Sequence, residues 1–261
     1  MIGKLMKHDI KRMSKVLIYL YAITLGFAGI TRLINIGRNI QAVYILGQIF
    51  AGITISGIAS ILVNTFVHIL RNFICSFYKD QSYLTHTLPV GKDKLLLSKY
   101  LSSLIVIVSS VVVSVMSLFI LYWSESLMKP LLMLIETAVS GFNMSAGVFI
   151  ALMVFVLFSQ ICSIMSMAFA AVVKANTYNH HRIMNGLLWF ALFYFGASIV
   201  SILAIALVFL MTGNIDYLLA EVMPQSAFVT IMITGLVVYC VYSVLFYFLC
   251  RRWFKKGVNV D

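Results

Sequence analysis

The chain has 261 residues, of which 62% are hydrophobic and only 10% are charged, and its mean hydropathy is +1.03. A soluble domain with a hydrated surface does not have this composition, so the sequence predicts an integral membrane protein. The formal net charge of +11 fits membrane topology and attraction to anionic lipid, and we expect no nucleic-acid binding.

Residues 1–15 predict an amphipathic helix at the cytoplasmic face of the membrane. Apolar and basic residues recur there at helical spacing and fall on opposite sides of the helix. A cleaved signal peptide does not fit, because Arg32 follows the apolar run without a small-residue cleavage pattern. The helix would anchor in lipid or contact a cytoplasmic partner. The apolar positions are Ile2, Met6, Ile10, Met13 and Leu17, and the basic ones are Lys4, Lys7, His8, Lys11 and Lys15.

Six apolar runs are each long enough to cross a hydrocarbon core of about 30 Å as a helix. The predicted fold is therefore an all-α membrane protein, a single transmembrane domain over residues 1–261. Spans one and two lie within residues 16–70, a cytoplasmic loop covers 71–99, spans three to six lie within 100–250, and 251–261 form a cytoplasmic tail. The runs are Val16–Ile34, Val43–Leu70, Tyr100–Trp123, Ala146–Val173, Leu187–Thr212 and Val229–Cys250.

The distribution of basic residues orients these spans. Sixteen of the nineteen Lys and Arg residues fall in the N-terminal segment, the loops after spans two and four, and the C-terminal tail. The positive-inside rule then places both termini in the cytoplasm of a multi-pass plasma-membrane protein.

The run Leu127–Val139 would be a seventh span, but it is short and contains Lys129, Pro130 and Glu136. We interpret it as a short helix at the outer face.

No residue pattern predicts catalysis or a resident cofactor in this chain. Gly91-Lys92-Asp93-Lys94 is not a phosphate-binding loop, because His86 stands in place of the first glycine and Asp93 in place of the magnesium-binding Ser or Thr. The adjacent His180 and His181 have no acidic ligand nearby, and the four cysteines show no paired spacing. We therefore expect no enzyme activity, no catalytic residue and no metal site.

Small polar residues form stripes along three predicted spans. Close helix packing through small residues is the simpler interpretation of each stripe taken alone. Together they would line a path for an amphipathic substrate. The span-two set is Gly52, Ser56 and Ser60, and the candidate path residues are Ser103, Ser110, Ser114 and Ser117 in span three, with Ser159, Gln160 and Ser163 in span four.

The polar stretch 77–99 interrupts the apolar pattern between spans two and three. Pro89 disfavours a helical conformation in Leu88, Gly91 allows a turn, and a new helix is predicted from Lys92 into span three. Tyr78, Tyr83 and Leu84 would be apolar anchors for a partner, since aromatic residues dominate docking sites. A solvated connector with its aromatics at the headgroups is the alternative.

This loop resembles the permease subunits of bacterial ABC exporters of the second type. The resemblance rests on Tyr78-Lys79-Asp80, the run Tyr83-Leu84-Thr85-His86-Thr87-Leu88-Pro89-Val90, and Leu95 to Lys99 entering the next span. The six-span layout, the amphipathic N-terminus and the two cytoplasmic ends agree with it. Gln81-Ser82 departs from the family, in which an acidic residue and a glycine commonly precede the Tyr-Leu-Thr, so Asp80 is the carboxylate available here.

The resemblance implies that the loop forms a short coupling helix that docks on a separate cytoplasmic ATPase. ATP and magnesium would be bound by that partner, and the permease would form a homodimer or pair with a sister permease in a Gram-positive type of exporter. The family moves antimicrobial and toxic peptides, lipophilic antibiotics, lipid-linked glycans and ions. Uncharged spans favour an amphipathic peptide or a lipid-like compound. The coupling residues would be Tyr78, Lys79, Asp80, Tyr83, Leu84, Thr85, His86, Leu88 and Pro89.

Two other classes of function are open to such a chain. A non-transporting membrane scaffold or immunity protein would bind a peptide or partner and need no ATPase. An intramembrane enzyme would need a nucleophile paired with a base, or a metal cluster, at membrane depth. The spans supply neither set of residues, so the scaffold is the stronger of these two alternatives.

Overall fold

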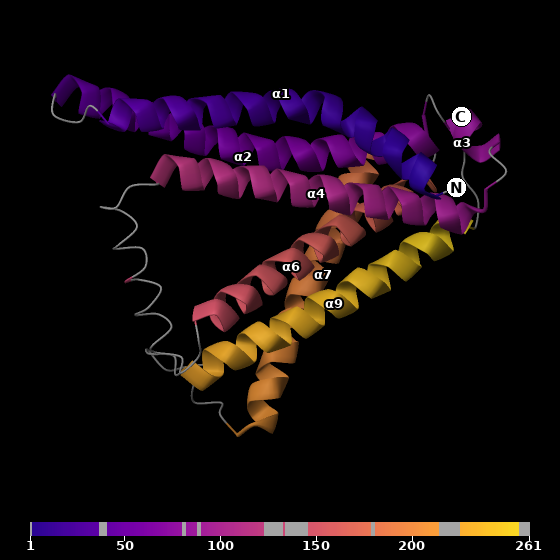
Figure 1. The fold of residues 1–261 in the computed structure, drawn as a ribbon. Coiled ribbons are helices and arrows are strands. Elements are labelled where there is room, and N and C mark those ends of the chain that lie inside the picture. Colours follow the sequence, from indigo (N-terminus) through magenta and orange to yellow (C-terminus); the bar gives the residue numbers. More distant parts are fainter. Residues whose placement is uncertain are drawn as a thin grey trace. The chain divides into compact units, whose positions relative to one another are not determined.

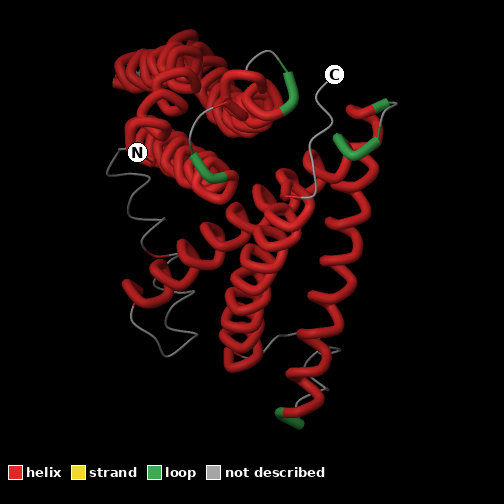
Figure 2. The backbone as a smooth tube through the Cα atoms, turned by 90° about the vertical axis from the view of Figure 1, so that its right-hand side faces the viewer, coloured by secondary structure: helices red, strands yellow, loops and turns green. Residues whose placement is uncertain are grey.

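A computed structural model describes residues 2–36, 41–79, 82–87, 90–122, 133, 146–178, 181–213 and 225–255. Throughout these residues the regular structure is helical (Figures 1 and 2). The chain separates into two compact units, residues 1–131 and 132–261, each containing three long helices. The sequence predicts one transmembrane domain, and the structure divides it into these halves.

Unit 1 contains three long helices and one short helix. The long ones are α1 (Ile2–Ile36), α2 (Gln41–Phe77) and α4 (Lys92–Tyr122), and the short helix α3 (Ser82–Thr87) contacts α2. All three long helices pack against one another, and they lie side by side in Figure 1. The start of α1, the end of α2 and the start of α4 meet at one end of the unit.

Unit 2 contains α6 (Ala146–Ala175), α7 (Arg182–Met211) and α9 (Gln225–Lys255). Here too every long helix contacts the other two. The end of α6, the start of α7 and the end of α9 share one end of the unit, as the side chains gathered there demonstrate.

All six long helices of the described residues are apolar enough and long enough to cross a membrane, which is consistent with a multi-pass membrane protein. Each predicted span falls almost entirely within one of these helices. The helices extend beyond the predicted spans, because residues such as Lys92 to Lys99 continue the helical pattern past the apolar run. The run proposed as a short outer-face helix, residues 127–139, lies almost entirely outside the described residues.

The N-terminal segment is helical, but it does not form a separate helix. It continues without a break into the first span, so that α1 runs from Ile2 to Ile36. No proline or glycine lies between Lys4 and Leu20, and nothing in that stretch interrupts the backbone hydrogen bonds of the helix. The position of residues 2–15 relative to a membrane surface stays a prediction.

Threonines and a glycine allow α1 and α2 to approach closely. A Cβ atom built on Gly57 would lie 3.2 Å from both Cγ2 and Oγ1 of Thr24. Further along the same contact, the hydroxyls of Thr31 and Thr54 are 3.3 Å apart. Gly52, which the sequence predicts as part of a packing stripe, is exposed and has open space around its Cα. The packing face of α2 therefore contains Gly57 and not Gly52.

Ser110 of α4 connects all three long helices of unit 1. Its Oγ lies 2.7 Å from the hydroxyl of Thr65 on α2 and 2.5 Å from the hydroxyl of Tyr21 on α1. Its own backbone partner is the carbonyl of Val106, 2.9 Å away. Polar side chains that bond between helices contribute about 0.6–2 kcal/mol each inside a membrane. Ser110 thus fixes the register of three helices at one level.

Unit 2 relies more on aromatic packing than on hydroxyl groups. Phe193 of α7 contacts Phe246 and Trp253 of α9, with ring centroids 5.2 and 6.0 Å apart. Tyr242 of α9 donates a 2.9 Å hydrogen bond to the carbonyl of Ala197 on α7. Aromatic pairs at such distances contribute about 0.5–1.5 kcal/mol beyond the area that they bury.

An aromatic cluster surrounds the ammonium group of Lys174 at the end of α6. Its Nζ lies 5.4 Å from the ring centroid of Trp189 on α7, 5.3 Å from that of Trp253 on α9, and 5.9 Å from that of Tyr178. Each cation–π contact of this kind is worth about 0.5–2 kcal/mol. One cation therefore holds together the ends of all three helices in unit 2.

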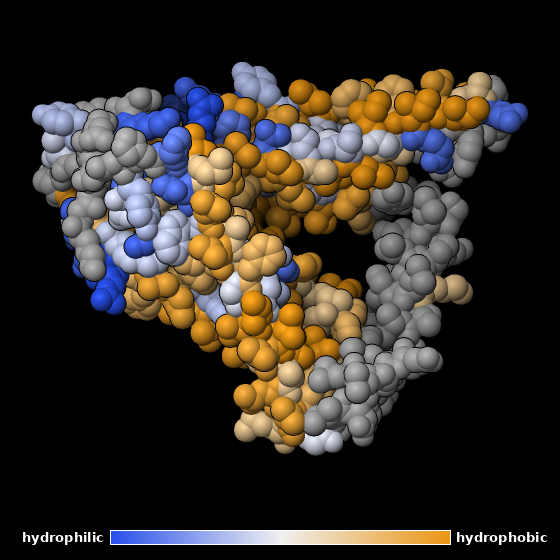
Figure 3. Space-filling model, turned by 180° about the vertical axis from the view of Figure 1, so that it is seen from behind, coloured by the Kyte–Doolittle hydropathy of each residue, from blue (hydrophilic) through white to orange (hydrophobic). Residues whose placement is uncertain are grey.

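Figure 3 displays the surface that results from this packing. On the face drawn there, apolar residues cover the lengths of the long helices, as lipid-facing surfaces require. In unit 1, polar residues are most extensive at the end where the N-terminus lies, and fewer appear at the opposite end. Tyr19, Val63 and Phe155 are among the exposed apolar side chains of the long helices.

The close approach at Gly57 gives a testable prediction. Gly57→Val should lower the thermal unfolding midpoint of the detergent-solubilised protein, because an enlarged side chain in a tight contact costs about 1–3 kcal/mol. Gly52→Val, on the same helix but facing open space, is the matched control and should unfold close to the wild type. Equal midpoints for the two variants, measured by fluorescence-detected size exclusion after heating, would contradict the assigned contact.

Candidate functional site

The coupling loop predicted over residues 71–99 is largely helical. Helix α2 continues to Phe77 and α4 begins at Lys92, so the two long helices include both ends of the predicted loop. The short helix α3 lies within this connection. Both ends of the connection are anchored in the interior of unit 1, by Phe77 on one side and by Leu95 and Leu96 on the other, all of which are buried.

Helix α3 presents Tyr83 to the surroundings. The residue is 77% exposed, although it lies only five positions after buried Tyr78. Ser82 at the start of α3 is buried, whereas Thr87 at its end is exposed. The remaining α3 positions, Leu84, Thr85 and His86, have a described helical backbone, but their side chains lie outside the described residues.

Tyr78 has a different place from the one the sequence predicts. It is 4% exposed, and its backbone N–H donates to the carbonyl of Ile74, which continues the helical turn. A side chain with so little exposed surface differs from the exposed anchor that the sequence predicts, and the coupling role of Tyr78 stays a prediction. Lys79 is exposed. Asp80, Leu88 and Pro89 lie outside the described residues.

The turn predicted at Gly91 and the helix predicted from Lys92 are both present. The Gly91 carbonyl accepts hydrogen bonds from the N–H groups of Lys94 and Leu95, at 2.9 and 3.2 Å. Asp93 lies in the first turn of α4, where its negative charge complements the positive end of the helix dipole. The start of α4 is therefore well defined, and it directs the next turn of the helix into the unit.

The central feature at this end of unit 1 is a buried ion pair between Lys99 of α4 and Asp9 of α1. Lys99 Nζ lies 2.5 Å from Asp9 Oδ1 and donates a second hydrogen bond of 2.8 Å to Ser76 Oγ on α2. The same ammonium lies 5.9 Å from the ring centroid of Phe77. All of these side chains are buried. We call Asp9, Ser76 and Lys99 the polar cluster.

The polar cluster connects the three long helices immediately beside the connection that carries α3. Ser76 precedes that connection, Lys99 follows it, and Asp9 comes from the N-terminal segment. A displacement of α3 would act on both flanking helices, and the ion pair would transmit it to α1. This arrangement is suited to relaying a mechanical input into the helix bundle.

Sequence reasoning did not identify Asp9 or assign Lys99 a partner. A signal was present, because Asp9 lies three residues after Met6 and four before Met13, on the apolar side of the amphipathic segment. A lone carboxylate on an apolar helix face requires a buried cation or a polar partner. Identifying Lys99 as that partner required the three-dimensional structure, since ninety residues separate the two.

The serines proposed as a substrate path are buried, and they divide between the two units. Ser103, Ser110, Ser114 and Ser117 lie on α4 in unit 1, whereas Ser159, Gln160 and Ser163 lie on α6 in unit 2. The six serine hydroxyls donate to carbonyls three or four residues earlier in their own helices. Within each unit this geometry favours helix packing, and the substrate path stays a prediction.

Within the described part of the chain, no group of three or more His, Cys, Asp or Glu residues could hold a metal ion. The four cysteines are free thiols. Comparison of the chain with protein-family models, with curated proteins and with solved structures found no match. The case for a function therefore rests on the sequence and on the geometry of this end of unit 1.

The polar cluster predicts a strong dependence of stability on each partner of the ion pair. Lys99→Met and Asp9→Leu should each lower the unfolding free energy by about 3–5 kcal/mol, because each leaves one buried charge unpaired. The double variant should recover much of that loss, since it buries no charge. Thermal unfolding in detergent measures the stability of the two single variants and of the double variant.

The control for this series is Lys94→Met, which removes an exposed lysine one turn and a half earlier on the same helix. Its unfolding midpoint should stay close to that of the wild type. If Lys99→Met and Lys94→Met behaved alike, or if the effects of the two single variants added without recovery, the ion pair would not be a stabilising contact.

Proposed function

We propose that this chain is the membrane permease subunit of an ATP-driven exporter whose ATPase is a separate cytoplasmic protein. The observation that carries the proposal is the arrangement around α3. The short helix with exposed Tyr83 belongs to the chain segment that joins Ser76 to Lys99, so a partner bound at α3 would act on the two helices that carry these residues. The resemblance of residues 78–99 to the coupling loop of exporter permeases gives the same assignment.

The charge distribution supports an external source of energy. Within the described parts of the six helices, the one ion pair with both partners buried lies at the end of unit 1, beside the connection to α3. Carriers coupled to protons or sodium ions place ionisable groups at membrane depth, where such groups are costly and therefore functional. A chain that lacks a nucleotide-binding motif and such groups would take its energy from a nucleotide-binding partner.

In this proposal the chain acts as a dimer, with itself or with a sister permease, and two ATPase subunits bind on the cytoplasmic side. Closure of the ATPases on ATP would displace α3 and shift the bundles between inward-open and outward-open packings. The exported compound would be amphipathic, such as an antimicrobial or toxic peptide, a lipophilic antibiotic or a lipid-like molecule. Such a compound can enter from the bilayer and needs no charged binding site.

The proposal predicts that Tyr83→Ala uncouples the permease from its ATPase. Tagged protein, expressed in its own host and purified in mild detergent, should retain a subunit with a phosphate-binding loop, identified by mass spectrometry, together with vanadate-sensitive ATP hydrolysis. Removal of a central aromatic anchor should reduce both by about tenfold or more, since such anchors contribute about 2 kcal/mol or more. Membrane insertion and the unfolding midpoint should be unchanged, because Tyr83 is exposed.

Ile183→Ala is the matched control, because Ile183 is 79% exposed at the start of α7 and lies on the same predicted side of the membrane. That variant should retain the ATPase and its activity. If the wild-type protein brought no ATPase with it and altered no ATP hydrolysis, the exporter assignment would fail. The chain would then be better described as a membrane scaffold or immunity protein.

A further inference from the structure

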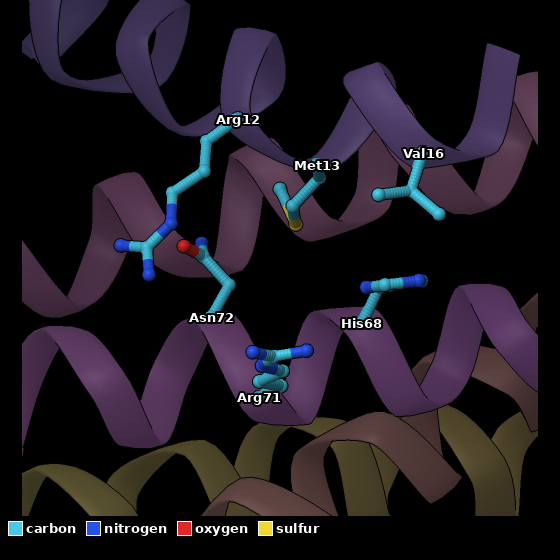
Figure 4. A pocket seen from close by; sticks show the side chains of 6 residues that line it. All are labelled: Arg12, Met13, Val16, His68, Arg71 and Asn72. Carbon is cyan, nitrogen blue, oxygen red and sulfur yellow. The ribbon is translucent and has the colours of Figure 1, made fainter.

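A cavity of about 210 Å³ lies between α1 and α2, one turn from the polar cluster. Figure 4 shows its lining: Arg12, Met13 and Val16 come from α1, and His68, Arg71 and Asn72 come from α2. The side chains of Arg12 and Asn72 extend toward each other from the two facing helices. Every one of these residues belongs to unit 1.

The lining of this cavity is positively charged. It includes two guanidinium groups and an imidazole, and among the described residues no acidic side chain lines it. The nearest carboxylate along α1 is that of Asp9, which pairs with Lys99. Two arginines on opposite walls can each present N–H donors to one tetrahedral anion, and phosphate is the anion whose geometry suits the guanidinium fork.

Asn72 independently favours a ligand that can donate a hydrogen bond. The residue is only 6% exposed, and its Oδ1 has no hydrogen-bond partner among the described residues. A buried acceptor left unpaired costs about 1–3 kcal/mol, so a ligand that donates a hydrogen bond here would be favoured. Phosphate oxygens bound by arginine are acceptors, and the donor would therefore come from a hydroxyl group near the phosphate.

The remaining lining of the cavity is apolar, and exposed apolar residues follow it along α1 and α2. Met13 and Val16 line the cavity, and Val16 is itself exposed. Beyond it, Tyr19 and Ile23 on α1 and Val67 on α2 are also exposed. A ligand with an acyl chain could place its chain along this surface, whereas a soluble phosphate compound would gain nothing from it.

We propose that this cavity binds the headgroup of an anionic phospholipid that carries a hydroxyl group, of the phosphatidylglycerol class. The phosphate would accept hydrogen bonds from Arg12 and Arg71, a headgroup hydroxyl would donate to Asn72 Oδ1, and the acyl chains would follow the exposed face of α1. Because the site lies one turn from Asp9, bound lipid would brace the end of unit 1 that holds the polar cluster. The site stands independently of the exporter assignment.

The test uses the purified full-length chain after delipidation, with native mass spectrometry and thermal unfolding as readouts. Phosphatidylglycerol should be retained and should raise the unfolding midpoint more than phosphatidylcholine, which has no net charge. Phosphatidic acid, which has the phosphate but no glycerol headgroup, should bind more weakly than phosphatidylglycerol and more tightly than phosphatidylcholine. Soluble glycerol 3-phosphate should neither bind nor compete, and competition by it would overturn the lipid assignment in favour of a soluble ligand.

Two variants and a control locate the site. Arg71→Gln should weaken phosphatidylglycerol binding about tenfold, the ratio expected for one lost charge-assisted hydrogen bond. Asn72→Leu should remove the preference for phosphatidylglycerol over phosphatidic acid without destabilising the lipid-free protein. Lys4 is an exposed basic residue of α1 that does not line the cavity, and Lys4→Gln should bind phosphatidylglycerol as tightly as the wild type does. Equal lipid binding by Arg71→Gln and wild type would refute the site.

Discussion

The ion pair between Asp9 and Lys99 is the constraint on which the organisation of unit 1 depends. Two charges taken out of water are tolerated only when each satisfies the other, and Ser76 supplies one further hydrogen bond. The pair therefore requires α1, α2 and α4 to meet at one level. The N-terminal segment meets this requirement as part of the continuous helix α1. The same contacts hold Ser76 and Lys99, which flank the connection that carries α3.

In each unit a lysine on one long helix contacts residues from the other two, but the groups around the lysine differ between the units. In unit 1, a lysine is neutralised by a carboxylate, and hydroxyls centred on Ser110 hold the helices further along. In unit 2, Lys174 is surrounded by aromatic rings from α7 and α9 and by Tyr178. A lysine thus joins three helix ends in each half of the chain. In unit 1, which carries α3, the lysine has an acidic partner. This partner, Asp9, couples Lys99 to the N-terminal segment.

Much of the fold could be predicted from the sequence, because hydropathy and the distribution of basic residues report directly on membrane spans. The six long helices, the turn at Gly91 and the helix from Lys92 follow from apolar runs and from local backbone preferences. The sequence did not identify which distant residues contact each other. The approach of Thr24 to Gly57 and the partner of Asp9 depend on how helices rotate about their axes, which a stripe such as Gly52 and Ser56 does not determine.

The central claim is that an ATPase acts on this chain at α3. The most direct measurement is in-cell photo-cross-linking from a benzoylphenylalanine placed at position 83, with a second probe at position 183 as the comparison. The account predicts a cross-linked product at position 83 that contains a subunit with a phosphate-binding loop, and none at position 183. Cross-links from position 83 to lipid alone, or to this chain alone, would contradict the claim.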